Sequence, residues 1–423
     1  MTPEPQDFAV DEEGHTSLLF RGARVVTPQA GAGFRRGREM DVLQLMDRVD
    51  VLVKAGRVWE VGPGIAPPSG SRVVEAEGRV LIPGFVDAHT HACWAGGRLD
   101  EWDLRRKGAS YSEILESGGG ILSTVRAVRE SSEVSLAAAL RVRLGWMLQE
   151  GTTAVEVKSG YGLDLENELK MLRAIRRADR DWPGRVVATA CIGHALDPEI
   201  PNHADRVIEE VLPGIHEEFP DVTIDAYCEE GAWSVEECVR LFRAARELDH
   251  PLRIHADQFN SLGMVGEALR LRVRSIDHLE ASTPEDLKRL ARSQAAGVLL
   301  PVSGFHLDDR YADGRTLIDA GGSVVVATNW NPGSAPSPSI PLAMGLAVRK
   351  NGLTPHEALT AVTANAAHLL GLGDIGRIAP RRRADLVLLR YRDERELAHT
   401  VGGSPVVAVI CGGRLVQGQA TPP

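Results

Sequence analysis

Leu81-Ile-Pro-Gly-Phe-Val-Asp-Ala-His-Thr-His91 joins an apolar, strand-like run to two histidines that stand two residues apart. Residues i and i+2 of a strand point to the same face, so His89 and His91 can converge on one ion. Neutral imidazoles suit zinc or divalent iron. A lone His-x-His also fits two half-buried polar residues at a strand end, so the segments around it must decide between the two interpretations.

The segment that follows, residues 85–370, alternates apolar strands with amphipathic helical patterns. One helix begins at a capping box, Ser234-Val-Glu-Glu237, and another at Thr283 with Pro284 in the first helical position. This alternation predicts an α/β fold, a closed (β/α)8 TIM-like barrel, whose function gathers at the carboxyl ends of its strands. The candidate strands end near His89, Lys158, His194, Glu229, His255, His278, Ser303 and Asn329.

The two ends of the chain share a different texture, with short strand-like runs between Gly and Pro turns. Residues 17–27, 50–62 and 71–78 have it near the amino end, and residues 384–389, 406–410 and 413–416 have it near the carboxyl end. We therefore expect residues 1–84 and 371–423 to form one small β-sandwich domain beside the 85–370 barrel.

Composition narrows the classes of partner. The 423 residues are 43% hydrophobic, enough for a large core, and carry a net charge of -10, which argues against nucleic acid and anionic membrane surfaces. Residues 1–15 lack an apolar signal core, and no apolar run is long enough to span a membrane, so we expect a cytoplasmic protein. The five cysteines form no Cys-x-x-Cys pair, which argues against a disulfide framework or a cysteine zinc site.

Two later histidines at predicted strand ends, His255 and His278, extend the first pair to a pattern that resembles the amidohydrolase superfamily. The resemblance is closer to one of its families, the imidazolonepropionases, and it extends over most of the chain. The motifs that carry it are Gly118-Gly-Gly-Ile-Leu-Ser-Thr-Val, Val157-Lys-Ser-Gly-Tyr-Gly-Leu163, Asp225-Ala-Tyr-Cys-Glu-Glu-Gly-Ala-Trp-Ser234, His255-Ala-Asp-Gln and Asn331-Pro-Gly-Ser334.

The resemblance implies one divalent metal ion, zinc or iron, bound by His89, His91 and His255. It places His278 beside the metal water or the substrate carbonyl, and Asn329 at the metal as a further ligand. His278 and Asn329 are thus the candidate catalytic residues. The implied substrate-binding residues are Arg98, Tyr161, His194, Gln258, Asn331, Gly333 and Ser334.

The implied substrate is a small anionic imidazolone, a five-membered cyclic amide with a propionate tail. Arg98 would give that carboxylate a fork of donors, with Tyr161 and His194 adding two more. The competing interpretations are a surface charge near Asp100 and Glu101 for Arg98, and a loop aromatic for Tyr161. We also expect a homodimer.

The sequence departs from the family pattern at strand eight. Asn329 stands where the pattern has Asp, and Gln258 stands where some relatives carry Glu. An amide can ligate through its oxygen but cannot accept a proton at neutral pH, which puts the proton-transfer step in question. Lys158 is expected to be structural and unmodified, because the Lys-Ser-Gly-Tyr context resembles the one-metal type.

The predicted activity is hydrolysis of 4-imidazolone-5-propanoate to N-formimidoyl-L-glutamate. One alternative is another amidohydrolase, such as a deaminase or a different cyclic amidase, against which Arg98 argues because a nucleobase has no carboxylate tail. A second alternative is a weakly active or non-catalytic binding protein, supported only by Asn329.

Overall fold

The computed structural model describes residues 17–108 and 119–418. The acidic amino terminus and Gly118, the first residue of the glycine-rich motif, lie outside these ranges. No helix within them is long and apolar enough to cross a membrane. All five cysteines are buried and free of disulfide bonds.

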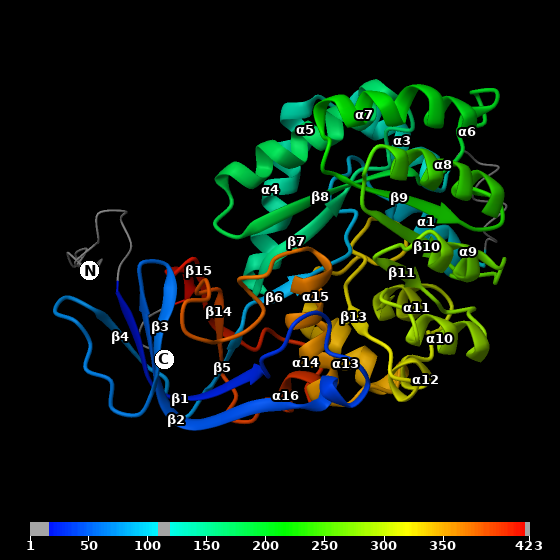
Figure 1. Cartoon of the computed structure of the whole chain (residues 1–423). Coiled ribbons are helices and arrows are strands. Elements are labelled where there is room, and N and C mark those ends of the chain that lie inside the picture. The colour runs from blue at the N-terminus through cyan, green and yellow to red at the C-terminus, as the bar shows by residue number, and fades with distance from the viewer. Residues whose placement is uncertain (1–16, 109–118, 419–423) are drawn as a thin grey trace.

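Eight parallel strands form the barrel, in chain order around its wall from β6 to β13 (Figure 1). Beyond β6 and β13 the ring is completed by a parallel bridge between Thr90 and Trp330 and by the Asn329 N–H, which donates to the His89 carbonyl at 3.0 Å. The predicted TIM-like barrel is confirmed. Its strands are β6 Phe85–Asp87, β7 Thr152–Lys158, β8 Arg185–Gly193, β9 Thr223–Cys228, β10 Leu252–Ala256, β11 Ser275–His278, β12 Ala296–Leu299 and β13 Val324–Val326.

Helices cover the outside of the barrel (Figure 1). Ser234 caps α8 in a capping box and Thr283 caps α10 with Pro284 at its start, both as the sequence predicts. The helices are α1 Leu99–Arg106, α3 Ile121–Glu130, α4 Glu133–Gln149, α5 Leu165–Asp181, α6 His203–Arg206, the π-helical turn η2 Val207–Val211, α7 Leu212–Glu218, α8 Val235–Glu247, α9 Met264–Arg270, α10 Pro284–Ala291, α11 Pro301–Leu307, α12 Gly314–Asp319, α13 Ile340–Lys350, α14 Pro355–Ala361, α15 Ala364–Leu369 and α16 Glu396–His399.

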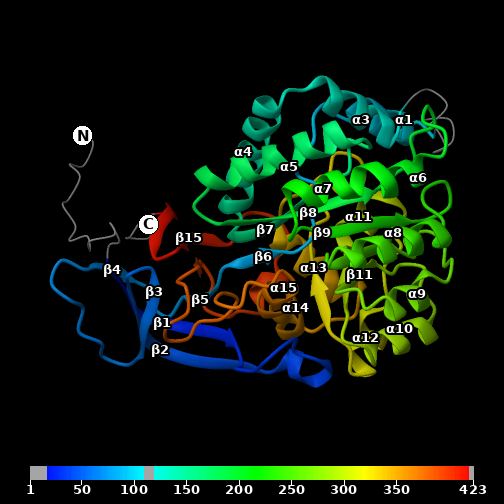
Figure 2. The same ribbon diagram turned by 45° about the horizontal axis from the view of Figure 1, so that its top comes forward.

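Strands from both ends of the chain form a second sheet beside the barrel (Figure 2). Its order is β16-β15-β14-β5-β1-β2-β3, with β4 paired to β1, and it encloses its own apolar cluster, as predicted for a composite sandwich-like domain. The strands are β1 Leu18–Pro28, β2 Leu43–Lys54, β3 Arg57–Gly62, β4 Arg72–Glu75, β5 Val80–Pro83, β14 Leu386–Leu389, β15 Val406–Cys411 and β16 Arg414–Gly418, and the short 3-10 helix η1 spans Gly37–Asp41.

The end predicted for the seventh barrel strand is wrong. β12 ends at Leu299, and Ser303 lies inside α11, which begins at Pro301. The apolar run continues through Val302, so periodicity did not separate strand from helix, whereas a Pro favours the first helical turn. Asn329 likewise follows β13 by three residues, in the left-handed region at φ 54°.

Candidate active site

His89, His91 and His255 come together at the carboxyl ends of β6 and β10. One ligand atom from each lies within 4.8 Å of those from the other two, and all three side chains are buried. The His91 and His255 Nε2 atoms are 3.2 Å apart. The two segments that place these residues, one following β6 and one inside β10, are the ones the sequence singled out.

These residues fit a metal ion. The His89 Nε2 atom is buried and has no hydrogen-bond partner among the described residues. Metal–nitrogen bonds of roughly 2.0–2.1 Å in tetrahedral geometry separate two ligand nitrogens by roughly 3.3–3.4 Å, close to the Nε2–Nε2 distance. A second grouping of Cys191, Asp225 and His255 fits less well, because burial raises the Cys191 thiol pKa well above its usual value.

The electrostatics favour neutral imidazoles. Burial lowers the pKa of His89 well below its usual value, and the positive charge of Lys158 adds to this effect. Burial likewise lowers the pKa of His91, with His194 as the next cause. A neutral imidazole keeps a lone pair for a cation, so the site is set up as a ligand set and not as a group of imidazolium ions.

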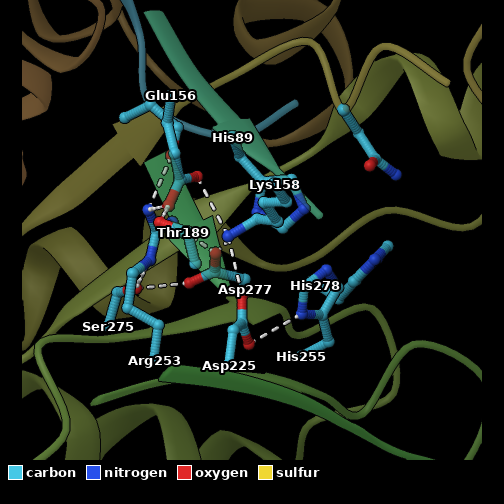
Figure 3. Close-up of polar contacts among 12 residues, drawn as sticks. His89, Glu156, Lys158, Thr189, Asp225, Arg253, His255, Ser275, Asp277 and His278 are labelled. Atoms are coloured by element: carbon cyan, nitrogen blue, oxygen red, sulfur yellow. Dashed lines mark hydrogen bonds and ion pairs between the residues drawn. The ribbon is translucent and has the colours of Figure 1, made fainter. Parts of the chain in front are cut away.

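Two buried carboxylates hold the outer nitrogens of the ligand histidines (Figure 3). His89 Nδ1 donates to Asp277 Oδ2 at 2.6 Å, and His255 Nδ1 donates to Asp225 Oδ1 at 3.1 Å. Burial alone would raise the pKa of Asp225, but His255 and Lys158 hold it well below its usual range. Both histidines therefore carry their proton on Nδ1 and present Nε2 to the centre, the arrangement found at many metal sites.

His278 lies beside this centre, with its ring centroid 5.7 Å from that of His255. Its φ of 86° departs from strand geometry, so His278 and the preceding Asp277 both approach His89 although regular neighbours would point apart. His278 Nδ1 donates to Glu280 Oε1 at 3.2 Å, which leaves Nε2 for a substrate or a water.

Asn329 lies beside His89 at the place where the barrel closes. Its Nδ2 donates to Ser303 Oγ at 2.8 Å, while its buried Oδ1 has no partner among the described residues. The oxygen is thus the free end of the amide. Ser303 was predicted to end a strand, but it lies in α11, and from this helix it accepts the hydrogen bond that orients Asn329.

The predicted rim residues also gather. The Tyr161 ring lies 6.0 Å from His91 and 5.2 Å from His194, and His91 stacks on His194 at 4.6 Å. Burial raises the pKa of the Tyr161 hydroxyl, so it stays a donor. Arg98 is the N-cap residue that precedes α1, and its Nε donates to Glu101 at 2.6 Å. A Cβ added at Gly333 would lie 2.6 Å from Arg98 Nη1, so Gly333 leaves room for the guanidinium.

The donor role expected of His194 stays a prediction, and its ring already makes one hydrogen bond within the protein. Its Nδ1 donates to the Gly160 carbonyl at 2.9 Å, and burial lowers its pKa to about 3. A neutral His194 with its proton on Nδ1 offers Nε2 only as an acceptor. His194 packs between Tyr161 and His91.

The other predicted pocket residues are oriented by their neighbours. Gln258 Oε1 accepts from the Tyr227 hydroxyl at 2.9 Å. Asn331 Oδ1 accepts from the backbone N–H groups of Gly333 and Ser334, each at 2.8 Å, and its Nδ2 donates to the Asn329 carbonyl at 2.7 Å. The Asn331 amide thus shapes its own loop behind Asn329.

Lys158 is buried at the end of β7 and is engaged on two sides. Its Nζ lies 2.6 Å from Asp225 Oδ2 and 2.9 Å from Glu156 Oε2. Burial and Arg253 oppose its charge, but Asp225, Glu156 and Asp277 together raise its pKa. A charged, doubly paired lysine matches the expectation of a structural Lys158.

Sequence reasoning missed the charged residues beneath the histidines and the partner of His278. Asp225 opens one of the quoted motifs but was given no role, and the other four residues, Glu156, Arg253, Asp277 and Glu280, belong to none of those motifs. A signal was present: Glu156 with Lys158 and Arg253 with His255 stand two apart within apolar strands, so each pair shares the inward face. Ionisable residues in a strand that is otherwise apolar are expected to be paired.

Comparison with known proteins defines the class and then the family. The Amidohydrolase family model matches residues 80–416, so the chain is an amidohydrolase. Imidazolonepropionase from Rubrobacter xylanophilus is 42% identical over 95% of this chain and 99% of its own length. That from Deinococcus radiodurans is 40% identical over 94% and 99%. The chain belongs to the imidazolonepropionase family.

Solved structures agree on the fold. A triazine hydrolase variant superposes with a TM-score of 0.73 at 19% identity, covering 96% of both chains. E. coli guanine deaminase superposes with a TM-score of 0.72 at 17% identity, covering 96% of this chain and 100% of its own. At these identities the structural similarity supports the shared fold and gives no information about the substrate.

Proposed function

We propose that this chain hydrolyses 4-imidazolone-5-propanoate to N-formimidoyl-L-glutamate with one divalent metal ion bound by His89, His91 and His255. The observation that carries the proposal is the buried trio of ligand nitrogens within 4.8 Å of one another, with an arginine and a tyrosine on the rim. Family membership supports the substrate, since the relatives bear the name imidazolonepropionase.

A divalent ion at such a site polarises a carbonyl and lowers the pKa of a water. The chain's own residues supply the rest. Arg98 and Tyr161 bind the propionate carboxylate by charge-assisted hydrogen bonds and so fix the ring over the histidines. His278, held through Nδ1 by Glu280, directs Nε2 toward the reacting amide. Asn329 offers an oxygen as a further ligand and no proton acceptor.

The test is metal analysis of the purified chain coupled to an assay of imidazolone turnover. We expect one divalent ion per chain and activity that a chelator removes and added metal restores. His89→Ala and His91→Ala should lose both metal and activity, because each removes one of three ligands. Full metal occupancy in both variants would contradict the proposed metal site. Turnover of unsubstituted ring amides in preference to the imidazolone would instead favour the activity of another cyclic amidase.

The choice of metal, the assembly and the location belong to the same proposal. Neutral imidazole nitrogens suit zinc and divalent iron alike, so the metal analysis decides between them. A homodimer and a cytoplasmic location are proposed as well. Light scattering at micromolar concentration tests the first, and fractionation of the source cells tests the second.

A further inference from the structure

A continuous network of five buried charged groups links His89 to His255 (Figure 3). Its carboxylates are Glu156, Asp225 and Asp277, its cations are Lys158 and Arg253, and none of the five is more than 2% exposed. Burying this many charges is costly unless each is paired, and a core of apolar side chains would do as well for stability alone. The network therefore points to a role beyond holding the barrel together.

The network has two arms, one to His89 and one to His255; His91, the third histidine of the group, has no arm. In the first, Asp277 accepts from His89 at 2.6 Å and from Arg253 Nη2 at 2.5 Å, while Ser275 donates to its other oxygen at 2.5 Å. In the second, Asp225 accepts from His255 at 3.1 Å and from Lys158 at 2.6 Å. His89 and His255 are thus each held by a carboxylate that is itself held by a buried cation.

Glu156 joins the arms without touching either histidine. Its Oε1 lies 2.6 Å from Arg253 Nη1 and accepts from Thr189 Oγ1 at 2.5 Å, and its Oε2 lies 2.9 Å from Lys158 Nζ. The contact with Lys158 is an ion contact and not an aligned hydrogen bond, since Oε2 makes no hydrogen bond. With three carboxylates against two cations, the charged network carries one net negative charge beside the histidines, which favours a cation there.

We propose that Glu156, Arg253 and Lys158 are positioning residues that, through Asp277 and Asp225, fix the orientation of His89 and His255 and so couple the two ligands to one metal ion. The inference rests on the proposed metal site but not on the identity of the substrate. It predicts that a side chain which touches no ligand still changes metal affinity.

The experiment measures metal affinity by competition with a chelator, in the full chain without substrate. Asp277→Asn and Asp225→Asn should each weaken metal binding about 10- to 100-fold, because an amide nitrogen would face a cation or a histidine N–H. Glu156→Gln should weaken it about 2- to 30-fold. If both arms act through Glu156, the effects of Glu156→Gln and Asp277→Asn should combine to less than their product.

A matched control separates positioning from folding. Asp385→Asn removes another buried carboxylate, one that lies just before β14, pairs with Arg383 at 2.9 Å and contacts no residue of the network. It should lower the melting temperature and leave metal affinity unchanged. Cobalt-loaded protein gives a second readout: the visible absorption bands should shift in Asp277→Asn and stay in place in Asp385→Asn.

Ser275→Ala replaces Asp277→Asn if the latter fails to fold, since it removes the hydrogen bond that Ser275 donates to Asp277 and the one it accepts from Arg253, and keeps every charge. Metal affinity and cobalt bands that match the parent in all network variants would overturn the inference while leaving the metal site intact. A parent chain that binds no divalent ion would overturn both the metal site and this inference. Metal binding with no imidazolone turnover would contradict the proposed reaction alone.

Discussion

Asn329 lies where a proton acceptor would be useful, yet its only free polar atom is a neutral amide oxygen. The same amide is fixed by Ser303 through Nδ2, so the side chain is oriented but uncharged. Its backbone is in the left-handed region, which both Asn and Asp tolerate. Exchange of one for the other therefore changes charge and proton affinity at nearly constant shape.

We expect Asn329→Asp to turn over faster. A carboxylate lowers the local positive charge, which by itself raises the pKa of a bound water, but it strengthens metal binding and restores an acceptor. Positioned acid–base groups raise reaction rates about 10²–10⁴-fold, so the gain from the proton acceptor should exceed the loss from the raised pKa of the water. The measurement is turnover at saturating metal across pH 6–9, with a rise of at least about tenfold expected. Equal rates at equal metal occupancy would mean that the proton leaves by another route.

Arg98 is the residue that we expect to bind the substrate's carboxylate. A hydrogen bond to a charged group is worth about 1.5–3 kcal/mol, so Arg98→Ala should lower kcat/KM about 10- to 100-fold. For a substrate analogue without the carboxylate, kcat/KM should be nearly the same in this variant as in the parent. Arg106→Ala, at the exposed last position of α1, the helix that Arg98 precedes, is the control and should leave kcat/KM unchanged. Equal discrimination between the two substrates by parent and variant would remove Arg98 from this role.

The sequence predicted that His89, His91 and His255 lie together, because the first two are i, i+2 neighbours and the third lies near the end of a strand. It did not predict what holds them. Asp277 adjoins His278, and period-two alternation assigns it to the opposite face, a rule that His278 breaks with its φ of 86°. Contacts such as Glu156 with Arg253 join residues 97 positions apart, and no local pattern encodes such a pairing.

At the scale of elements, the strands and caps were the predictable part. Ser234 and Thr283 cap their helices as local hydrogen-bonding rules require. The strand that was placed wrongly, β12, ends at Leu299, two residues before Pro301 begins α11, and the apolar run across this boundary suits either a strand or a buried helix. The loop after β7, residues 159–163, was recognised by its motif. The sequence did not predict which residue supports this loop.

Glu168, on α5, is that support. Its carboxylate is fully buried and accepts from the N–H groups of Gly160, Gly162 and Leu163 at 3.0, 2.7 and 3.0 Å. The loop it holds carries Tyr161. A side-chain amide cannot satisfy three donors with one oxygen, because its nitrogen is itself a donor.

We therefore expect Glu168→Gln to loosen the loop and raise KM severalfold, with metal content unchanged. Exposed Glu166 in the first turn of the same helix gives the matched control, since Glu166→Gln should alter neither quantity. Steady-state kinetics and metal analysis on the same preparations check the prediction. Loss of metal in Glu168→Gln, or an unchanged KM, would contradict it.

At the scale of the whole molecule, the barrel and the composite sheet share a core. The division at residues 84 and 371 stays a prediction, and the packing shows what joins the two parts. β14 pairs with β5 in register, Val387 opposite Ile82, and these two side chains belong to the same apolar cluster as the barrel helices. The alternate residue, Leu388, belongs to the cluster enclosed by the small sheet.

This arrangement predicts that the molecule unfolds in one calorimetric transition. Leu388 and Leu389 are neighbours of the same type on β14, both fully buried, with Leu388 in the small sheet's cluster and Leu389 in the barrel's. Each Leu→Ala change leaves a cavity and should cost about 2–5 kcal/mol. If the strand couples both cores, either change lowers the melting temperature of the single transition by a similar amount. Two resolved transitions, with Leu388→Ala moving only one of them, would show that the small domain unfolds independently of the barrel.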